Sequence, residues 1–364
     1  MADRQKYLIS KNIGRKVLMI GVFYKNNAPG GMAAVIQYYE KYFEVLRYTS
    51  SWKMSNSFIK LIYVICAYLK VFIILLFDFR VRLLHIHVAA DGSFWRKSMF
   101  LKLGKTFGKK VIFHVHASRF KDFYNESEKR SKIIENLKMA DCLIVLSESW
   151  KKWFIDIGIH KDNIQILHNI TEYPDIADKV LDENGKVRFL FLGELGDRKG
   201  VFDILRGLNN NKEELKGRME LRIGGNTNEE KLISFINENG LSSFVKFEGW
   251  VAGEKKKKLL NWADIYILPS FNEGLPIGIL EAMSYKCPII STAVGGIPEV
   301  VVPQINGTLV TPGSDEEIIL AIKKYVSNPS IIDKEGAASQ VMVGDYLPDF
   351  VLVHLNKIYL KMMC

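Results

Sequence analysis

Cysteine is scarce in this sequence: there are four residues in 364, and none of them forms a C-x-x-C pair. Zinc-finger, redox-dithiol and disulfide-framework proteins need paired cysteines, so the chain belongs to none of these classes. The G-x-G-x-x-G fingerprint of nicotinamide enzymes is also absent. No nucleic-acid-binding signature and no internal repeat occurs. A reducing cytosol is the simplest environment for such a chain, so we expect a cytoplasmic protein.

Long uninterrupted apolar segments are equally scarce. The first sixteen residues are polar, so we expect no signal peptide there. The most apolar stretch, residues 61–77, is divided by Lys70 into runs of nine and seven residues. Both runs are shorter than the roughly 20 residues that span a bilayer. The stretch therefore favours a buried helix of a soluble domain, and a helix at a membrane surface or a true span are the alternatives.

Acidic residues are few in the first half of the chain. Residues 1–170 contain 28 Lys and Arg but 13 Asp and Glu, a net charge of +15, whereas the rest carries −5 and the whole chain +10. The basic residues stand among apolar ones in 58–82 and 94–110. This mixture favours contact with an anionic membrane surface over a nucleic acid. The alternative is an ordinary solvated, lysine-rich surface, and the four lysines of residues 255–258 are interpreted in that way, as an exposed helix face.

The length suggests two domains, and the pattern predicts the same fold class for both. Short apolar, β-rich runs alternate with helical stretches, which is typical of an α/β fold with doubly wound parallel sheets. The predicted strands cover residues 17–23, 82–88, 110–115, 141–146, 188–193, 219–223, 245–248, 264–268 and 288–291. We expect a first domain over 1–170, a polar linker from 171 to 186 that opens a second domain over 171–347, and a helix over 348–364 that packs back on the first domain.

The stretch from 268 to 299 contains the most informative residues. A predicted strand ends at Leu268, and Pro276 stands where a new helix would begin. In open α/β sheets, ligands bind beyond the carboxyl ends of the strands, and a helix N-terminus there suits a diphosphate. Glu273 precedes this helix and Glu281 follows eight residues later, so each carboxylate can grip a sugar diol. In isolation, such a pair of acids is more often ordinary surface.

The residues around this pair resemble the donor-site signature of family-4 retaining glycosyltransferases, which have the GT-B fold. Two other segments match in order: residues 193–200 (GELGDRKG) are similar to a G-R-L-x-x-x-K-G loop, and residues 167–169 (LHN) to a strand-end P-N-G segment. The resemblance implies two Rossmann-like domains that face a central cleft. The signature itself consists of Pro269, Ser270, Glu273, Gly274, Leu280, Glu281, Ala282, Met283, Pro288 and the run Gly295-Gly296-Ile297-Pro298-Glu299.

The resemblance implies a role for individual residues. Glu273 would contact the transferred sugar beside the reacting carbon, Lys199 would stabilise the leaving diphosphate, and Glu281 would hold the ribose. His116, at the end of a first-domain strand, would point at the donor sugar, and a structural role is its alternative. The other implied donor-binding positions are Arg198, Gly274, Leu275, Ile277, Gly30, Gly31 and Asn169, and the implied acceptor-side positions are Arg119, Arg96 and Lys97.

Two residues depart from the family's pattern. Glu194 stands where an arginine usually faces the diphosphate. Arg198 could supply that charge, and the alternative is a site that works with one cation and more backbone amides. Pro276 removes one amide from the donor loop, which leaves Leu275 and Ile277 as donors. The chain has no D-x-D motif, so we expect no metal ion and no cofactor. A metal site made of His85, His87, His114 and His116 is an alternative that needs their two strands to be adjacent.

The function implied by the resemblance is retaining transfer of a sugar from a nucleotide-diphosphate sugar, with UDP-sugars favoured. The acceptor would be a lipid-linked glycan or polysaccharide of bacterial capsule or exopolysaccharide synthesis, at the inner face of the cytoplasmic membrane. Two alternatives share the fold: a nucleotide-sugar 2-epimerase, and a non-catalytic protein that binds nucleotide sugars or glycans.

Overall fold

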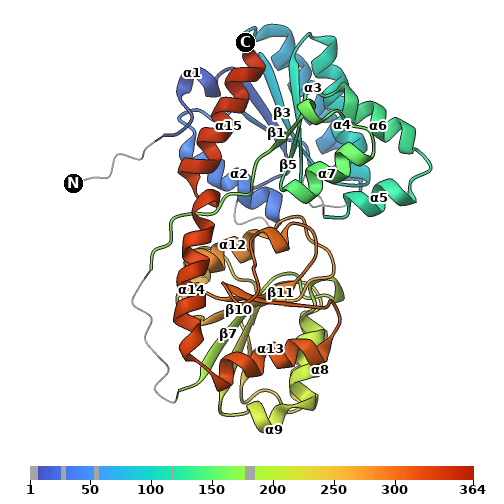
Figure 1. Cartoon of the computed structure of the whole chain (residues 1–364). Helices are drawn as coiled ribbons and strands as arrows, with labels where there is room; N and C mark the ends of the chain where they lie inside the picture. The colour runs from blue at the N-terminus through green and yellow to red at the C-terminus, as the bar shows by residue number, and fades with distance from the viewer. Residues whose placement is uncertain (1–6, 26–29, 53–56, 117, 177–184) are drawn as a thin grey trace. The chain divides into compact units, whose positions relative to one another are not determined.

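The computed structural model describes residues 7–25, 30–52, 57–116, 118–176 and 185–364 (Figure 1). It divides into two compact units, one made of Met1–Ile170 with Tyr346–Cys364 and the other of Thr171–Asp345. Each unit contains one parallel six-stranded sheet with flanking helices. The fold is therefore α/β, as the alternating pattern predicts. Residues 177–184 of the expected linker lie outside the described residues.

The sheet of the first unit has the strand order β2-β1-β3-β4-β5-β6. Its central strands are buried along their whole length because helices cover both faces, which explains their nearly continuous apolar sequences. The order reverses between β1 and β3, since the chain moves from β1 to β2 and then returns to the other side of β1. The strands are β1 (Val17–Gly21), β2 (Tyr48–Ser50), β3 (Leu83–Val88), β4 (Lys110–Val115), β5 (Cys142–Val145) and β6 (Ile164–Ile166).

The helices of the first unit include one that comes from the far end of the chain. The helix α15 (Pro348–Met363) packs beside α1 and β3 (Figure 1), and the Tyr359 hydroxyl lies 2.6 Å from His85 Nδ1 in the core. The other helices of this unit are α1 (Lys11–Gly14), α2 (Gly31–Tyr42), α3 (Ser57–Phe77), α4 (Gly92–Thr106), α5 (Phe120–Glu126), α6 (Arg130–Met139), α7 (Glu148–Asp156) and the 3₁₀ turn η1 (Lys161–Asn163).

The sheet of the second unit has the order β12-β11-β10-β7-β8-β9. Here the chain moves outward from β7 to β8 and β9, and then crosses to the other side of β7 to form β10. The order therefore reverses between β7 and β10. The strands are β7 (Val187–Leu192), β8 (Met219–Gly224), β9 (Val245–Phe247), β10 (Ile265–Leu268), β11 (Ile289–Thr292) and β12 (Gly307–Val310).

A buried ion pair joins β7 and the start of β10 at the edge opposite their carboxyl ends. Arg188 donates to both carboxylate oxygens of Asp264, with a shortest distance of 2.6 Å, and their main chains also pair. The contact fixes the register of the two strands that meet where the strand order reverses. The helices of this unit are η2 (Asp197–Lys199), α8 (Val201–Asn210), α9 (Lys212–Leu215), α10 (Glu229–Glu238), α11 (Gly253–Trp262), α12 (Ile277–Ser284), η3 (Ile297–Glu299), α13 (Asp315–Ser327) and α14 (Ser330–Met342), and the turn η4 (Val343–Tyr346) follows.

The helix α3 corrects one expectation. The prediction that residues 61–77 form a buried helix is wrong. Ala67, Val71 and Leu75 form a single buried stripe, and most of the other side chains are exposed. By length and composition the segment Ile59–Phe77 could span a membrane, with a mean hydropathy of 2.4, and 17% of it is buried. Apolar sequence does not distinguish a core helix from one whose apolar face is uncovered.

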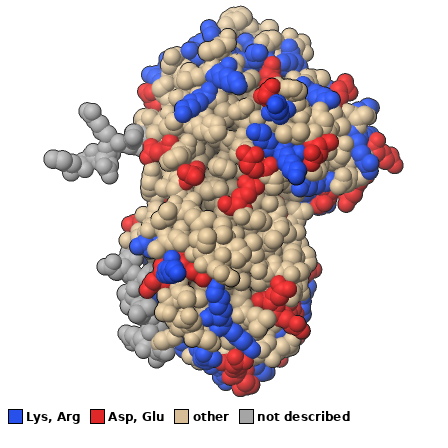
Figure 2. Space-filling model, viewed as in Figure 1, with Lys and Arg blue, Asp and Glu red and all other residues tan. Residues whose placement is uncertain are grey.

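The basic residues of the first half are not collected on the face drawn in Figure 2. That face shows Lys and Arg interspersed with Asp and Glu on both units. Several basic residues of the first unit are paired: Arg47 with Asp78 at 2.8 Å, and Lys105 with Asp141 at 2.7 Å.

Candidate active site

The most developed site lies in the second unit, where the strand order reverses between β7 and β10. The loop after β7 carries Lys199, and the loop after β10 carries Glu273. Ligands of open α/β sheets bind beyond the carboxyl ends of the strands at such a reversal. Sequence separates the two side chains by 74 residues, and this topology brings them together.

Lys199 and Glu273 form a largely buried ion pair. The lysine ammonium donates to Glu273 Oε1, and Ser270 Oγ donates to the same oxygen at 3.0 Å. Both acids of the motif are over nine-tenths buried, and Ser270 is fully buried. Burial of a carboxylate is tolerated only with such partners. The pair places one positive and one negative group side by side, the combination that can contact a phosphate and a sugar hydroxyl at once.

Glycines allow the loops around this pair to approach closely. Gly200 ends η2 in the left-handed region, and a Cβ there would lie 2.2 Å from the Pro269 carbonyl oxygen. Gly295 has φ +56°, and its Cβ would lie 1.9 Å from the Glu273 carbonyl oxygen. The next residue, Gly296, donates its amide to the Gly274 carbonyl at 2.6 Å. The loops thus hold the Glu273 backbone where only glycine fits beside it.

The helix α12 begins directly after the Glu273 loop. Pro276 is its N-cap, one position earlier than a proline inside the first turn, and the side chains of Leu275 and Ile277 are buried. The first amides of a helix have no partner within the helix, so they and the helix dipole favour an anion at this end. Because the side chains of Leu275 and Ile277 are buried, a ligand at this end of α12 would meet backbone and not these side chains.

Glu281 has a lysine partner that sequence reasoning missed. On α12, Glu281 Oε1 accepts from Lys256 Nζ at 2.5 Å, and the acid is 7% exposed. Lys256 belongs to the lysine run on α11, which we interpreted as an exposed face. The side chains of Lys255 and Lys257 are 47% and 41% exposed and pair with Glu248 and Glu254, whereas that of Lys256 is 28% exposed, so the interpretation is wrong for Lys256. A run of identical residues gives no signal for which member turns inward.

Glu194 forms an ion pair with Arg198, and this pair offsets part of the positive charge of the loop after β7. Arg198 Nη2 lies 2.8 Å from Glu194 Oε2, and its Nη1 donates to the Asn272 carbonyl at 3.3 Å. The main chain of Arg198 also accepts from the Phe271 amide at 2.9 Å, which ties the two loops together. Arg198 is therefore a loop-joining residue whose charge is partly offset by the acid four positions earlier.

Other sequence-predicted residues lie in the first unit. Gly30 is the N-cap of α2 with φ +106°, and Gly31 is the first residue of that helix. Both follow β1, where the order of this sheet reverses. Asn169 is buried near the end of this unit. Lys199 and Glu273 belong to the second unit.

Four histidines form a stack along β3 and β4: His85, His87 and His114 are buried, and His116, directly after β4, is partly buried. The strands are adjacent and set His87 opposite His114. His87 Nδ1 lies 2.8 Å from His116 Nε2, and His85 Nε2 lies 3.1 Å from His114 Nδ1. Burial lowers the pKa of both His85 and His116 to about 3, so the rings are neutral at pH 7. Ligand atoms of His85, His87 and His114 lie within 4.8 Å of one another, close enough to share a metal ion, although the rings also bond to each other.

The three residues expected on the acceptor side occupy different environments. Lys97 is fully buried: its ammonium donates to the Gly21 carbonyl at 2.9 Å and to Ser51 Oγ, and burial lowers its pKa well below the usual value. That position gives it an internal contact and not a surface one. The Arg96 guanidinium lies 4.0 Å from the centre of the Trp52 ring, and Arg119 is exposed as the N-cap of α5.

One comparison is a family model that matches most of the second unit. Residues 173–340 match the family model of glycosyl transferases group 1. An uncharacterized glycosyltransferase of Methanocaldococcus jannaschii is 29% identical over 64% of this chain and 63% of that protein. The lipopolysaccharide 1,6-galactosyltransferase of Escherichia coli K12 is 26% identical over 56% of this chain and 57% of that protein. The chain thus matches about three fifths of the length of these relatives.

Solved structures extend the likeness to both units. Anabaena Alr3699/HepE in complex with UDP and glucose superimposes with a TM-score of 0.71, at 15% identity, over 95% of this chain and 99% of that chain. A lipopolysaccharide outer core galactosyltransferase in its apo form gives a TM-score of 0.66, at 20% identity, over 95% and 99%. At these identities the likeness shows the fold, which is that of GT-B glycosyltransferases. Residues 173–340 are thus similar to the glycosyl transferases of group 1, and the curated relatives carry glycosyltransferase names.

Proposed function

We propose that this protein is a retaining glycosyltransferase that uses a nucleotide-diphosphate sugar, and that the site between β7 and β10 binds the donor. One observation carries the proposal: the buried Lys199–Glu273 pair lies beside the N-terminus of α12, at the reversal of the strand order. The pair offers a cation for the diphosphate and a carboxylate for the sugar. Glu281, further along α12, offers a second carboxylate for the ribose.

Lys199 supplies positive charge where the leaving group forms. An ammonium has three N–H donors, so Lys199 can keep its bond to Glu273 and still donate to a phosphate oxygen. With the first amides of α12 it stabilises the negative charge that develops on the diphosphate. We therefore propose transfer without a metal ion and without a cofactor.

The bond changes follow from retention of configuration. The bond between the anomeric carbon and the diphosphate oxygen breaks, and an acceptor hydroxyl attacks from the same face of the sugar. Its proton passes to the departing phosphate oxygen, so the protein need not supply a base. Glu273 orients the sugar through its hydroxyls, and the neutral His116 is suited to donate or accept a hydrogen bond at the sugar.

The names of the relatives support a choice of substrate class. A structure of the same fold binds UDP and glucose, and a relative transfers galactose in lipopolysaccharide synthesis. We propose a UDP-sugar donor and a lipid-linked or polysaccharide acceptor of cell-surface glycan synthesis, at the cytoplasmic face of the membrane.

The test is incubation with UDP-, GDP- and dTDP-sugars without acceptor, followed by addition of a membrane lipid extract. A transferase releases nucleotide only after the extract is added, and chelation of divalent ions leaves its rate unchanged. Release of UDP with 2-acetamidoglucal before the extract identifies a 2-epimerase instead. Binding of nucleotide sugar without turnover under either condition identifies a non-catalytic protein.

Two site variants test whether Glu273 and Lys199 contribute to sugar transfer. We expect Glu273→Gln and Lys199→Ala each to lower transfer about 100-fold or more, the scale of one lost transition-state contact. Glu230→Gln and Lys334→Ala make the same chemical changes at exposed positions of the same unit and serve as controls. Activity of both site variants within threefold of their controls contradicts the assignment.

A further inference from the structure

The helix α3 presents an apolar surface to solvent. Its exposed face lies opposite the stripe of Ala67, Val71 and Leu75 that packs inward. At roughly half a side-chain surface each, the exposed residues present an area on the order of 800 Å², beyond the roughly 300–600 Å² of the largest patch on a typical monomer. These residues are Ile59, Leu61, Ile62, Ile65, Leu69, Phe72, Ile73, Leu76, Phe77 and, just after the helix, Phe79.

The charges around this apolar face are positive. The helix contains no Asp or Glu, and its two charged residues are Lys60 and Lys70. Asp78, which follows it, is bonded to Arg47 and Arg80, each at 2.8 Å, so its charge is offset. The neighbouring helix α4 also contains no acid. A second copy of this face would bring like charges together, whereas anionic lipid head groups complement it.

The topology determines how the helix can meet a bilayer. The chain enters α3 from β2 and leaves it into β3, and both strands flank β1 in one sheet. A helix that crossed a membrane would separate these strands. Because β2 and β3 belong to the same sheet, α3 can only lie in the plane of the interface with one face inserted.

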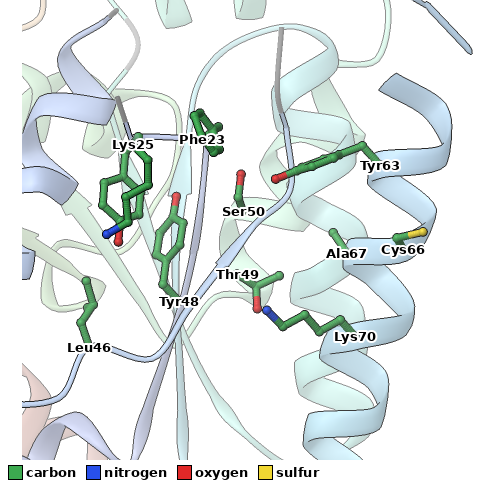
Figure 3. Close-up of a pocket in the computed structure, with 11 residues that line it drawn as sticks. Phe23, Lys25, Leu46, Tyr48, Thr49, Ser50, Tyr63, Cys66, Ala67 and Lys70 are labelled. Carbon is green, nitrogen blue, oxygen red and sulfur yellow. The ribbon is translucent and has the colours of Figure 1, made fainter. Parts of the chain in front are cut away.

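A pocket opens between α3 and the ends of β1 and β2 (Figure 3). Its volume is about 530 Å³, and aromatic side chains of Phe23, Tyr24, Tyr48 and Tyr63 form part of its wall. Lys70 extends from α3 toward Thr49 of β2. The pocket therefore combines an apolar wall with a cation next to the exposed apolar face.

Two polar groups of the pocket have no partner among the residues with described positions. Thr49 is 2% exposed, and its hydroxyl makes no hydrogen bond. Lys70 makes no ion pair, whereas the pocket's other lysine, Lys25, is bonded to Glu40. An unpaired ammonium beside an unpaired buried hydroxyl is suited to the oxygens of a phosphate group.

We propose that the exposed face of α3 docks in the interface of an anionic bilayer, and that the pocket holds the phosphate of one membrane lipid between Lys70 and Thr49. The inference rests on the proposed function in one respect: docking would bring the enzyme to a lipid-linked acceptor. The physical contact itself depends on the first unit alone.

Native cysteines provide the test in the full-length chain. Cys66 on α3 and Cys364 are exposed, whereas Cys142 and Cys287 are buried. An environment-sensitive dye on Cys66, in a Cys364→Ser background, should shift to the blue on phosphatidylcholine vesicles that contain phosphatidylglycerol. The control is the same dye on Cys364 in a Cys66→Ser background, which should not shift. An unchanged Cys66 signal on these vesicles overturns the proposal.

Variants separate the apolar contact from the phosphate contact. Ile65→Asp should lower co-sedimentation with phosphatidylglycerol vesicles at least tenfold, while Leu320→Asp, an exposed apolar residue of the second unit, should not. Lys70→Ala should lower affinity about fivefold, the effect of one basic residue at a membrane surface. Thr49→Val, which keeps the shape, should weaken phosphatidylglycerol binding and leave neutral vesicles unaffected. Equal binding by Ile65→Asp and wild type contradicts docking through α3.

Two further readouts keep this inference distinct from the proposed function. UDP binding, measured by calorimetry, should be unchanged in the α3 variants, because the proposed donor site lies in the second unit. A wild-type circular dichroism spectrum and unfolding transition show that the first unit of these variants is folded. If the wild-type protein binds a UDP-sugar but no vesicle, the docking proposal is refuted and the proposed transferase function is unaffected. If it binds vesicles but no UDP-sugar, the proposed function is refuted and the docking proposal is unaffected. A dimer that Ile65→Asp dissociates, with no vesicle binding, shows that a second copy covers the face and also refutes the docking.

Discussion

The contact between Gly295 and the Glu273 loop gives the sharpest structural prediction. A Cβ at position 295 would lie 1.9 Å from the Glu273 carbonyl oxygen and 2.9 Å from that of Gly274. Ordinary contact needs more than 3.0 Å, so the Glu273 loop must move by about 1 Å or more in Gly295→Ala. A misplacement of about 1 Å at a catalytic group lowers the rate about 100-fold. We therefore expect Gly295→Ala to lower kcat/KM for sugar transfer by about that factor.

The control for this variant is Gly217→Ala. Gly217 also has a positive φ, +81°, but its Cβ would meet nothing within 4 Å. Both variants carry the backbone strain of about 1 kcal/mol, and only Gly295→Ala adds the steric displacement. Thermal unfolding measures the strain and steady-state kinetics measures the displacement. If Gly295→Ala and Gly217→Ala have the same kcat/KM, the loop contact does not position Glu273 and the reasoning is refuted.

Two further predictions concern stability. In the folded chain the pKa of His85 and of His116 is about 3, so as the pH falls below about 6.5 the unfolded chain takes up protons first. The contribution of these histidines to stability is complete above that pH, and each should lower the free energy of unfolding by up to about 2 kcal/mol at pH 5. An unfolding temperature that stays constant from pH 7.5 to 5 contradicts their burial. Asp264→Ala leaves the buried Arg188 without its carboxylate partner and should lower the free energy of unfolding, measured in urea, by about 3–5 kcal/mol. The control Asp333→Ala removes an exposed acid and should lower it little. Equal losses in the two variants would show that the ion pair does not stabilise the sheet.

Sequence patterns predicted the central strands of both sheets because those strands are buried on both faces and consist of apolar runs. Of the four edge strands, β9 was predicted, and β2, β6 and β12 were not. The three missed strands have three, three and four residues, and their side chains are only partly buried, so their sequences give a weak signal. The order of strands could not be derived either, since it depends on which strand pairs with β7 and not on local sequence.

The candidate site shows the same division between local and long-range information. The spacing of Glu273, Pro276 and Glu281 is local, and it predicted a loop, a helix start and a helix residue where the structure has them. The inward turn of Lys256, the burial of Lys97 and the exposure of α3 depend on what packs against each side chain. Composition alone treats a lysine on a surface and a lysine in a core identically, so these features were interpreted incorrectly or missed.

The central claim is that an activated sugar binds between the Lys199 loop and the N-terminus of α12. A crystal structure of the protein grown with a UDP-sugar tests it most directly. The account predicts the diphosphate within hydrogen-bond distance of Lys199 Nζ and of the backbone amides at the start of α12, with Glu281 on the ribose. A donor bound away from these groups, or a Lys199–Glu273 pair that closes the site to every nucleotide sugar offered, would contradict it.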